Sequence, residues 1–227
     1  MRITKYGQSV VLQVVAGAVM ISIGILFFHV SPPVKAVAIA LSFLFAGFTL
    51  LFFRDPERKC PLGVADAHGV ISPADGKIVA LRETEEPDYL QRPAWLVSIF
   101  MSPVNVHVNR IPISGTVGYL RYVPGDYLIA FDAKSSERNE RMLIGIEGDR
   151  SRVLFRQIAG FVARRIVCAL KPGQTVTAGE RFGMIKFGSR VDIFFPKSYT
   201  PVVNLHDSVR AGETMLALSA PQMSNQQ

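Results

Sequence analysis

"ERFGMIKFGSRVDIFFP" (residues 180–196) consists of two apolar runs separated by the pair Gly188-Ser189. Val, Ile and Phe recur in both runs, as is typical of β-strands. A Gly-Ser pair between strands is typical of a tight turn or a bulge, because Gly adopts backbone angles that other residues avoid. The stretch therefore predicts β structure, and it leaves open whether the pair serves only as a turn.

The chain beyond Val64 continues as short strand-like runs separated by Gly, Pro and Asp turns, such as "GVISPADGKIVAL", "AWLVSIFM" and "RMLIGIEGD". No segment after Phe53 carries a long apolar stripe of helical period. Residues 175–185 and 208–218 share the frame V-x-A-G-E, which is similar to the strand-turn-strand rhythm of barrel-sandwich carrier domains. We therefore expect a mainly β fold, a compact antiparallel barrel-sandwich-like domain over residues 54–227.

Two apolar runs precede this domain, and residues 9–30 and 36–53 contain no Asp, Glu, Lys or Arg. At about 1.5 Å rise per residue, each run approaches the roughly 30 Å thickness of the bilayer core. A cleaved signal peptide is the alternative, but its apolar region is only about 7–15 residues long. We expect a transmembrane helical hairpin over residues 1–53, in which Pro32-Pro33 ends the first helix and reverses the chain.

Basic residues flank the two runs on their outer sides, whereas the loop between them has only Lys35. These flanking residues are Arg2, Lys5, Arg54, Arg58 and Lys59. The distribution predicts that the rest of the chain is cytoplasmic, and Cys60 and Cys168 then fit as free thiols. The net charge of +7 suits an anionic leaflet. No nucleic-acid-binding motif is present, so no nucleic acid partner is expected.

Two stretches carry candidate acid/base residues. Strand alternation in "MSPVNVHVNRIP" places His107 on one face with Asn105 and Asn109, and three valines on the other. An ordinary half-exposed strand would give the same pattern. Asp75 in "SPADGKI" is explained by turn chemistry unless it has a partner.

Arg164 and Arg165 are adjacent in "GFVARRIV", so their side chains leave a strand on opposite faces. One of the two is expected to face a core or cleft, where its charge must meet an anion. The polar segment 132–141 reads as an exposed loop. No metal-ligand spacing, phosphate-cradling loop or nucleophile elbow is present, so we expect no metal.

Seven stretches occur together in an order that resembles the phosphatidylserine decarboxylase family, in its short form with a membrane hairpin. They are "FFRDPER", "SPADGKI", "MSPVNVHVNR", "YVPGD", "ERNER", "GFVARRIV" and "ERFGMIKFGSRVDIFFP". The resemblance covers the chain from Phe52 to about Leu218, and the ordered set is highly specific.

The resemblance implies pyruvoyl-dependent decarboxylation of phosphatidylserine to phosphatidylethanolamine. In such a chain Ser189 attacks the carbonyl of Gly188, and β-elimination of the resulting ester leaves a dehydroalanine that hydrolyses to a pyruvoyl group. The products would be a 1–188 piece and a 189–227 piece, which stay together as a heterodimer. The pyruvoyl ketone would form a Schiff base with the substrate amine, an electron-sink role that makes pyridoxal phosphate unnecessary. Longer bacterial members have Thr where Arg190 follows the serine.

The resemblance also assigns acid/base work to Asp75 and His107, which match the family's Asp and His stretches. Arg164 and Arg165 are candidates for binding the substrate, one of the two facing the site. Longer members resemble H-x-x-H at the His stretch, and the second His, credited there with self-cleavage, is Arg110 in this chain. The group that triggers cleavage is therefore left open.

A bacterial plasma membrane is the implied location, with phosphatidylserine as the membrane-borne partner and a homodimer compatible with the family. Two other functions remain open on the sequence. A membrane-tethered barrel-sandwich adaptor without enzyme activity would explain the hairpin and the strands. A serine hydrolase would use Ser102 or Ser189, although the expected cytoplasmic orientation disfavours it.

Overall fold

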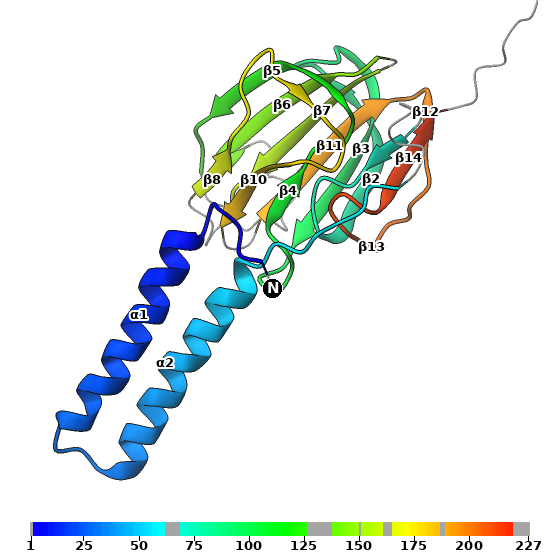
Figure 1. Cartoon of the computed structure of the whole chain (residues 1–227). Helices are drawn as coiled ribbons and strands as arrows, with labels where there is room; N and C mark the ends of the chain where they lie inside the picture. The colour runs from blue at the N-terminus through cyan, green and yellow to red at the C-terminus, as the bar shows by residue number, and fades with distance from the viewer. Residues whose placement is uncertain are drawn as a thin grey trace, which may run out of the picture. The chain divides into compact units, whose positions relative to one another are not determined.

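A computed structural model of the chain divides into two compact units, Met1–Pro56 and Glu57–Gln227. The described residues are 2–61, 69–126, 138–149, 151–160, 165–186 and 189–219. The first unit is helical and the second is built from antiparallel strands (Figure 1). The expected mainly β class, preceded by two apolar helices, is confirmed.

The helical unit contains α1 (Gln8–Gly24), the 3-10 helix η1 (Ile25–Phe27) and α2 (Pro32–Phe52). The helices over Gln8–Phe27 and Pro32–Phe52 are each long and apolar enough to cross a membrane. Large apolar side chains along both helices are exposed, including Leu12 and Leu44. Such side chains are stable in lipid and costly in water, which indicates membrane association.

The two prolines act differently from the expectation. The first helix ends at Phe27, because Phe28 already has an extended backbone. Pro32 and Pro33 occupy the first turn of α2 instead of terminating the preceding helix. Proline is favoured there because its missing N–H would have no partner in the first turn of a helix. The two helices run over Gln8–Phe27 and Pro32–Phe52, so each begins and ends earlier than the predicted runs 9–30 and 36–53.

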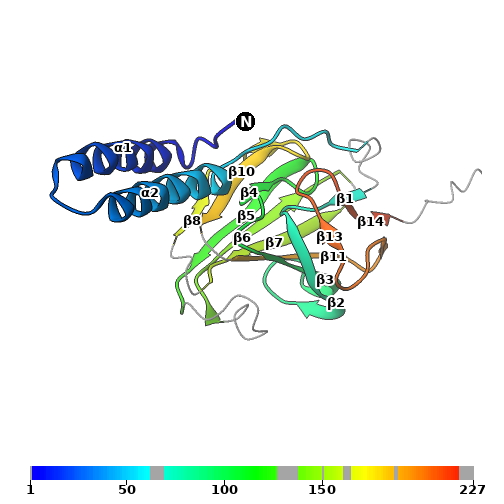
Figure 2. The ribbon, with the colours of Figure 1, turned by 90° about the horizontal axis from the view of Figure 1, so that it is seen from below.

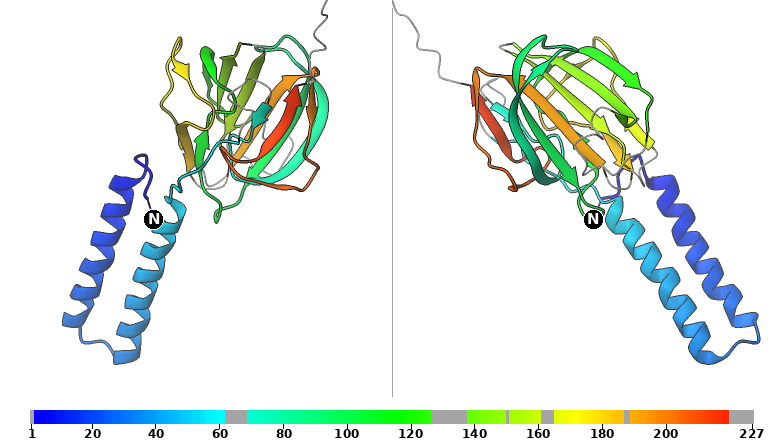
Figure 3. Two further views of the ribbon diagram at one scale, coloured as in Figure 1. Left: turned by 45° about the vertical axis from the view of Figure 1, so that its right-hand side comes forward. Right: turned by 180° about the vertical axis from the view of Figure 1, so that it is seen from behind.

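The strand unit has one large sheet and two small ones among the described residues, and every strand pair within them is antiparallel. The large sheet runs in the order β13 (Ser208–Val209), β2 (Gly76–Glu86), β3 (Arg92–Met101), β11 (Ser189–Pro196), β7 (Arg152–Ile158), β6 (Arg141–Glu147), β5 (Gly115–Val123) and β9 (Thr175–Val176). The small sheets are β4 (Val108–Arg110), β10 (Arg181–Lys186), β8 (Arg165–Cys168), and β1 (Gly69–Ile71), β14 (Met215–Ser219), β12 (Tyr199–Pro201). The large sheet curls, as its long strands show in Figures 2 and 3.

The central strand β11 is buried on both faces along its whole length. Val191, Ile193 and Phe195 belong to the main core cluster, which also contains residues of the two small sheets. Phe194 points to the opposite face and belongs to a second apolar cluster with Leu96 and Leu154. A strand covered on both faces needs apolar residues at successive positions, which explains why its sequence does not alternate.

The repeated V-x-A-G-E frame forms the two edges of the large sheet. Residues 175–185 contain β9 and then β10, and residues 208–218 contain β13 and then β14. Each segment thus leaves an edge of the large sheet and enters a small one. The turns use Gly179 and Gly212 at φ +84° and +74°, and Arg110 donates from Nη1 to the Gly179 carbonyl at 2.8 Å.

Gly212→Ala is expected to destabilise the strand unit more than Gly173→Ala. Both glycines have positive φ, at +74° and +78°, so both substitutions carry a backbone strain of about 1–2 kcal/mol. A Cβ at Gly212 would lie 2.7 Å from Arg110 Cδ, whereas one at Gly173 meets nothing within 4 Å. The crowding adds about 1–3 kcal/mol at Gly212. Urea unfolding of the detergent-solubilised variants measures the difference. Equal losses in the free energy of unfolding would show that the Arg110 side chain moves away from the added Cβ at no cost.

Candidate active site

Ser189 is the first residue of β11 and is fully buried. Its Oγ lies 3.3 Å from Met101 Sδ, and the two residues are paired in the β11–β3 ladder. Gly188 lies outside the described residues. β10 pairs with β4 and β8, whereas β11 pairs with β3 and β7. The chain therefore passes from the small sheet to the large one between Lys186 and Ser189. Since β10 and β11 lie in different sheets, these two strands do not form a hairpin.

A second segment changes sheets beside the first. Residues 102–107 connect β3 of the large sheet to β4 of the small one. Met101, at the end of β3, pairs with Ser189, and Val108, at the start of β4, pairs with Met184. Segment 102–107 thus begins beside Ser189 of the large sheet and ends beside Met184 of the small one.

Segment 102–107 has its own hydrogen bonds. The backbone N–H and the hydroxyl of Ser102 both donate to Asn105 Oδ1, at 2.9 and 2.7 Å. His107 Nδ1 lies 3.0 Å from the Asn105 carbonyl oxygen, and the imidazole is fully buried. These contacts fix the orientation of the ring, and a backbone acceptor at Nδ1 favours the tautomer with its proton there.

The expected half-exposed strand around His107 is wrong. β4 begins only at Val108, and Asn105 lies in the preceding connection. His107, Val108 and Asn109 are all buried, so both faces are covered here, and the exposed residues are Pro103 and Val104 in the preceding connection. The alternation of Val with polar residues wrongly indicated an exposed polar face, because two sheets meet at this strand and cover both of its faces.

Two amides line the inner face beside Met101. Gln157 Nε2 donates to Asn109 Oδ1 at 2.9 Å, and Asn109 Nδ2 lies 3.4 Å from the Pro73 carbonyl oxygen and 3.8 Å from Met101 Sδ. Both amides are fully buried. Sequence reasoning missed Gln157, although a polar residue among the apolar positions of "RVLFRQI" was the available signal.

Asp75 has partners beyond its turn. Its Oδ2 lies 2.9 Å from Arg58 Nη2, and its Oδ1 accepts the Ala211 N–H at 2.8 Å. Arg58 also contacts Glu213 through Nη1 at 2.8 Å. The Arg58 and Asp75 side chains are only 8% and 10% exposed. A buried guanidinium at this distance favours the ionised carboxylate. Arg58 was read from the sequence only as a topology signal.

The structure describes the contacts of Arg110, the residue that stands where the longer members have a second histidine. It follows Asn109 on β4, so its side chain leaves on the other face. The guanidinium donates to the Gly179 carbonyl in the edge turn of the large sheet. Its backbone N–H donates to the Pro73 carbonyl at 2.9 Å, which ties β4 to the segment that carries Asp75.

The described member of the arginine pair is Arg165, an exposed residue of β8, whereas Arg164 lies outside the described residues. Arg165 pairs in register with Lys186, the last residue of β10. Partial burial lowers the pKa of the Lys186 ammonium, and the Arg165 charge lowers it further. Arg165 and Lys186 thus place positive charge shortly before the Gly188-Ser189 pair in the sequence.

Cys60 and Cys168 are free thiols, and burial raises the pKa of both, which disfavours the reactive thiolate. Across the described ranges, no three His, Cys, Asp or Glu side chains are grouped so that they could hold a metal ion. Residues 132–137 of the expected exposed loop lie outside the description.

Comparison with known proteins gives a consistent family. The family model described as phosphatidylserine decarboxylase matches residues 45–217. A phosphatidylserine decarboxylase proenzyme of Chlorobium luteolum is 49% identical over 216 residues, 95% of this chain and 99% of the relative. Proteins of the same name from Chlorobium chlorochromatii and Chlorobaculum parvum are 48% and 49% identical, each over 98% of its length, covering 94% and 95% of this chain.

Arg58→Met is expected to lower the free energy of unfolding by about 3–5 kcal/mol, because it leaves the buried Asp75 carboxylate without its cation. Arg152→Met is the matched control, since its ion pair with Glu147 is half-exposed and contributes about 0–1 kcal/mol. Urea unfolding measures both variants. Losses that are small and similar in both variants would mean that the Asp75 charge is supported without Arg58.

Proposed function

Because the chain belongs to the phosphatidylserine decarboxylase family, we propose that it decarboxylates phosphatidylserine with a pyruvoyl group made from its own Ser189. The decarboxylase activity follows from the family, which spans most of the chain. The product is phosphatidylethanolamine. The relatives are named proenzymes, which supports a chain that must be processed before it acts.

The observation that carries the proposal is the position of Ser189 beside a second connection between the same two sheets. Ser189 begins a strand held on both sides by β3 and β7. The adjacent connection carries His107, whose ring is buried and oriented through Nδ1. A serine with a fixed backbone and a nearby base is the arrangement that intramolecular acyl transfer requires.

Processing would proceed from this arrangement. Ser189 Oγ attacks the Gly188 carbonyl, His107 takes the hydroxyl proton, and the peptide C–N bond breaks to give an ester. Loss of the Ser189 Cα proton and of the carboxylate leaves a dehydroalanine at the new N-terminus. Water then replaces its nitrogen, which departs as ammonia, and the ketone remains on the 189–227 piece.

The surroundings of Ser189 fit a small buried ketone. Met101 gives an apolar wall at 3.3 Å, and the Asn109 and Gln157 amides lie on the same inner face. The ketone supplies the chemistry of bonding the substrate amine and accepting the electron pair that CO₂ leaves behind. His107 returns a proton to the substrate Cα. Asp75, held by Arg58, contributes a fixed negative charge.

Substrate binding and location complete the proposal. Arg164 or Arg165 would bind the headgroup phosphate by its charge. Residues 1–53 would hold the chain in a bacterial plasma membrane, with residues 54–227 as the catalytic domain on the cytoplasmic side, where the flanking basic residues favour it. The 1–188 and 189–227 pieces would remain a heterodimer, since β11 pairs with β3 over its whole length. A homodimer is compatible with this arrangement.

The intact mass of the purified protein tests the proposal directly. The wild type is expected to give two fragments split after Gly188, the smaller one lacking a free amino terminus and matching a pyruvoyl group. Ser189→Ala is expected to remain one chain and to produce no CO₂ from phosphatidylserine. A folded wild type that stays whole would refute self-processing and favour the adaptor alternative.

His107→Gln is expected to slow processing by about 10²–10⁴-fold, because general base assistance is lost while the side chain stays polar. Ser102→Ala is the control, since Ser102 donates to Asn105 and takes no part in the attack. Fragment formation after synthesis in a cell-free system, followed by gel electrophoresis, gives both rates. Normal processing in His107→Gln would exclude His107 as the base. A block of processing in Ser102→Ala would mean that cleavage requires Ser102, which contradicts its use as a control.

A further inference from the structure

Arg190 follows Ser189 but lies on the other face of the large sheet, because successive side chains of a strand alternate. Its side chain is only 6% exposed. Nε donates to Asp192 Oδ1 at 2.6 Å, and Nη2 donates to Ser98 Oγ at 2.7 Å. Asp192 and Ser98 are buried as well, so the three side chains form a buried polar cluster.

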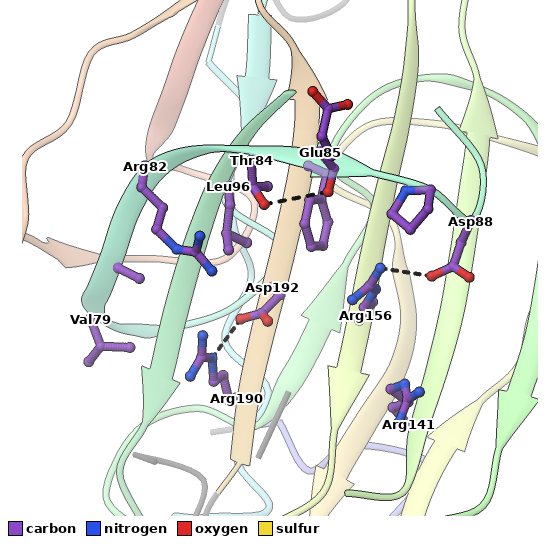
Figure 4. Close-up of a pocket in the computed structure, with 13 residues that line it drawn as sticks. Val79, Arg82, Thr84, Glu85, Asp88, Leu96, Arg141, Arg156, Arg190 and Asp192 are labelled. Carbon is purple, nitrogen blue, oxygen red and sulfur yellow. Dashed lines mark hydrogen bonds and ion pairs between the residues drawn. The ribbon is translucent and has the colours of Figure 1, made fainter. Parts of the chain in front are cut away.

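This cluster lies at a cavity of about 480 Å³ on the face opposite Ser189, shown in Figure 4. Arg156 and Arg141 also line this cavity. Arg156 pairs with Asp88 at 2.8 Å, within the part of the chain that precedes the Gly-Ser pair. Arg190 differs from both because it belongs to the part that follows that pair.

Cleavage after Gly188 would change what holds the first residues of β11. The strand would lose its covalent connection to β10 at the end where the ketone is formed. A strand end released in this way loses the covalent restraint on its first residue, and Ser189 pairs only with β3, because the ladder to β7 begins at Arg190. The ladder to β3 continues, but Ser189 is its last pair.

We propose that Arg190 is a positioning residue that holds this new chain end after cleavage, an inference that rests on the proposed self-processing. Its bond to Ser98 joins the 189–227 piece to β3 of the 1–188 piece. Its bond to Asp192 fixes the same guanidinium two residues further along β11. The side chain thereby keeps the backbone at 189 against Met101, although it touches neither the ketone nor the substrate.

Arginine suits this task because one guanidinium presents several donors in a rigid plane. It reaches the carboxylate with Nε and the hydroxyl with Nη2 at the same time. The Asp192 side chain is 1% exposed, so the bond also compensates a buried charge that would otherwise be costly.

The test compares Arg190→Gln/Asp192→Asn in a cleaving chain and in the uncleaved Ser189→Ala chain. Removing both charges together avoids a lone buried carboxylate. Amide hydrogen exchange of the peptide that begins at residue 189 is followed by mass spectrometry. The double substitution is expected to accelerate exchange of this peptide about tenfold or more in the cleaved chain, and not in the uncleaved one.

Arg141→Gln is the matched control, because Arg141 lines the same cavity from β6 and donates to the Asn139 carbonyl. It is expected to leave exchange of the peptide unchanged in both chains. Equal acceleration in the cleaved and uncleaved chains, or none in either, would overturn the positioning role. A wild type that is never cleaved is recognised from its mass, and it refutes the proposed function together with this inference.

Discussion

The register between two pairs of strands is the constraint on which the candidate site depends. Met101 pairs with Ser189 and Val108 pairs with Met184, so the β3–β4 connection starts beside the first residue of β11 and ends beside β10. A shift of one residue in either ladder would turn Ser189 or Asn109 to the opposite face. The curled large sheet and the small sheet beside it are therefore what bring residues 82 positions apart along the chain, His107 and Ser189, to neighbouring connections.

The charge of Asp75 has partners supplied by distant segments. Arg58 meets Asp75 from 17 residues away and Glu213 from 155 residues away. Buried ions are tolerated only when paired and hydrogen-bonded, so such contacts exist only once the strand unit is assembled. The contacts that stabilise the Asp75 charge therefore form as the strand unit folds. This coupling explains why Arg58 matters to the site even though it precedes all the strands in the part of the chain that the structure describes.

The sequence predicted the classes of structure well and the pairings poorly. Apolar runs without charges identified both helices, and runs of Val, Ile and Phe identified β11 and its neighbours. Local patterns failed where two sheets meet: His107 alternates with valines as if half-exposed, yet both faces are covered. Arg58 and Gln157 escaped notice because their partners lie far away in sequence. Pro32 and Pro33 misled for a local reason, since proline can open a helix as well as end one.

For the proposed cleavage, a Gly-Ser site between strands of two different sheets has a physical advantage over one in a hairpin turn. In a hairpin the cleaved ends would belong to two strands paired with each other, and both would fray together. Here β10 and β11 pair with different partners, so each retains its own two neighbours without the peptide link. The proposed cleavage between separate sheets would therefore disturb neither ladder directly, and only the first residues of β11 would need further support. That requirement falls on the one side chain that follows the serine and reaches across to β3, the guanidinium of Arg190.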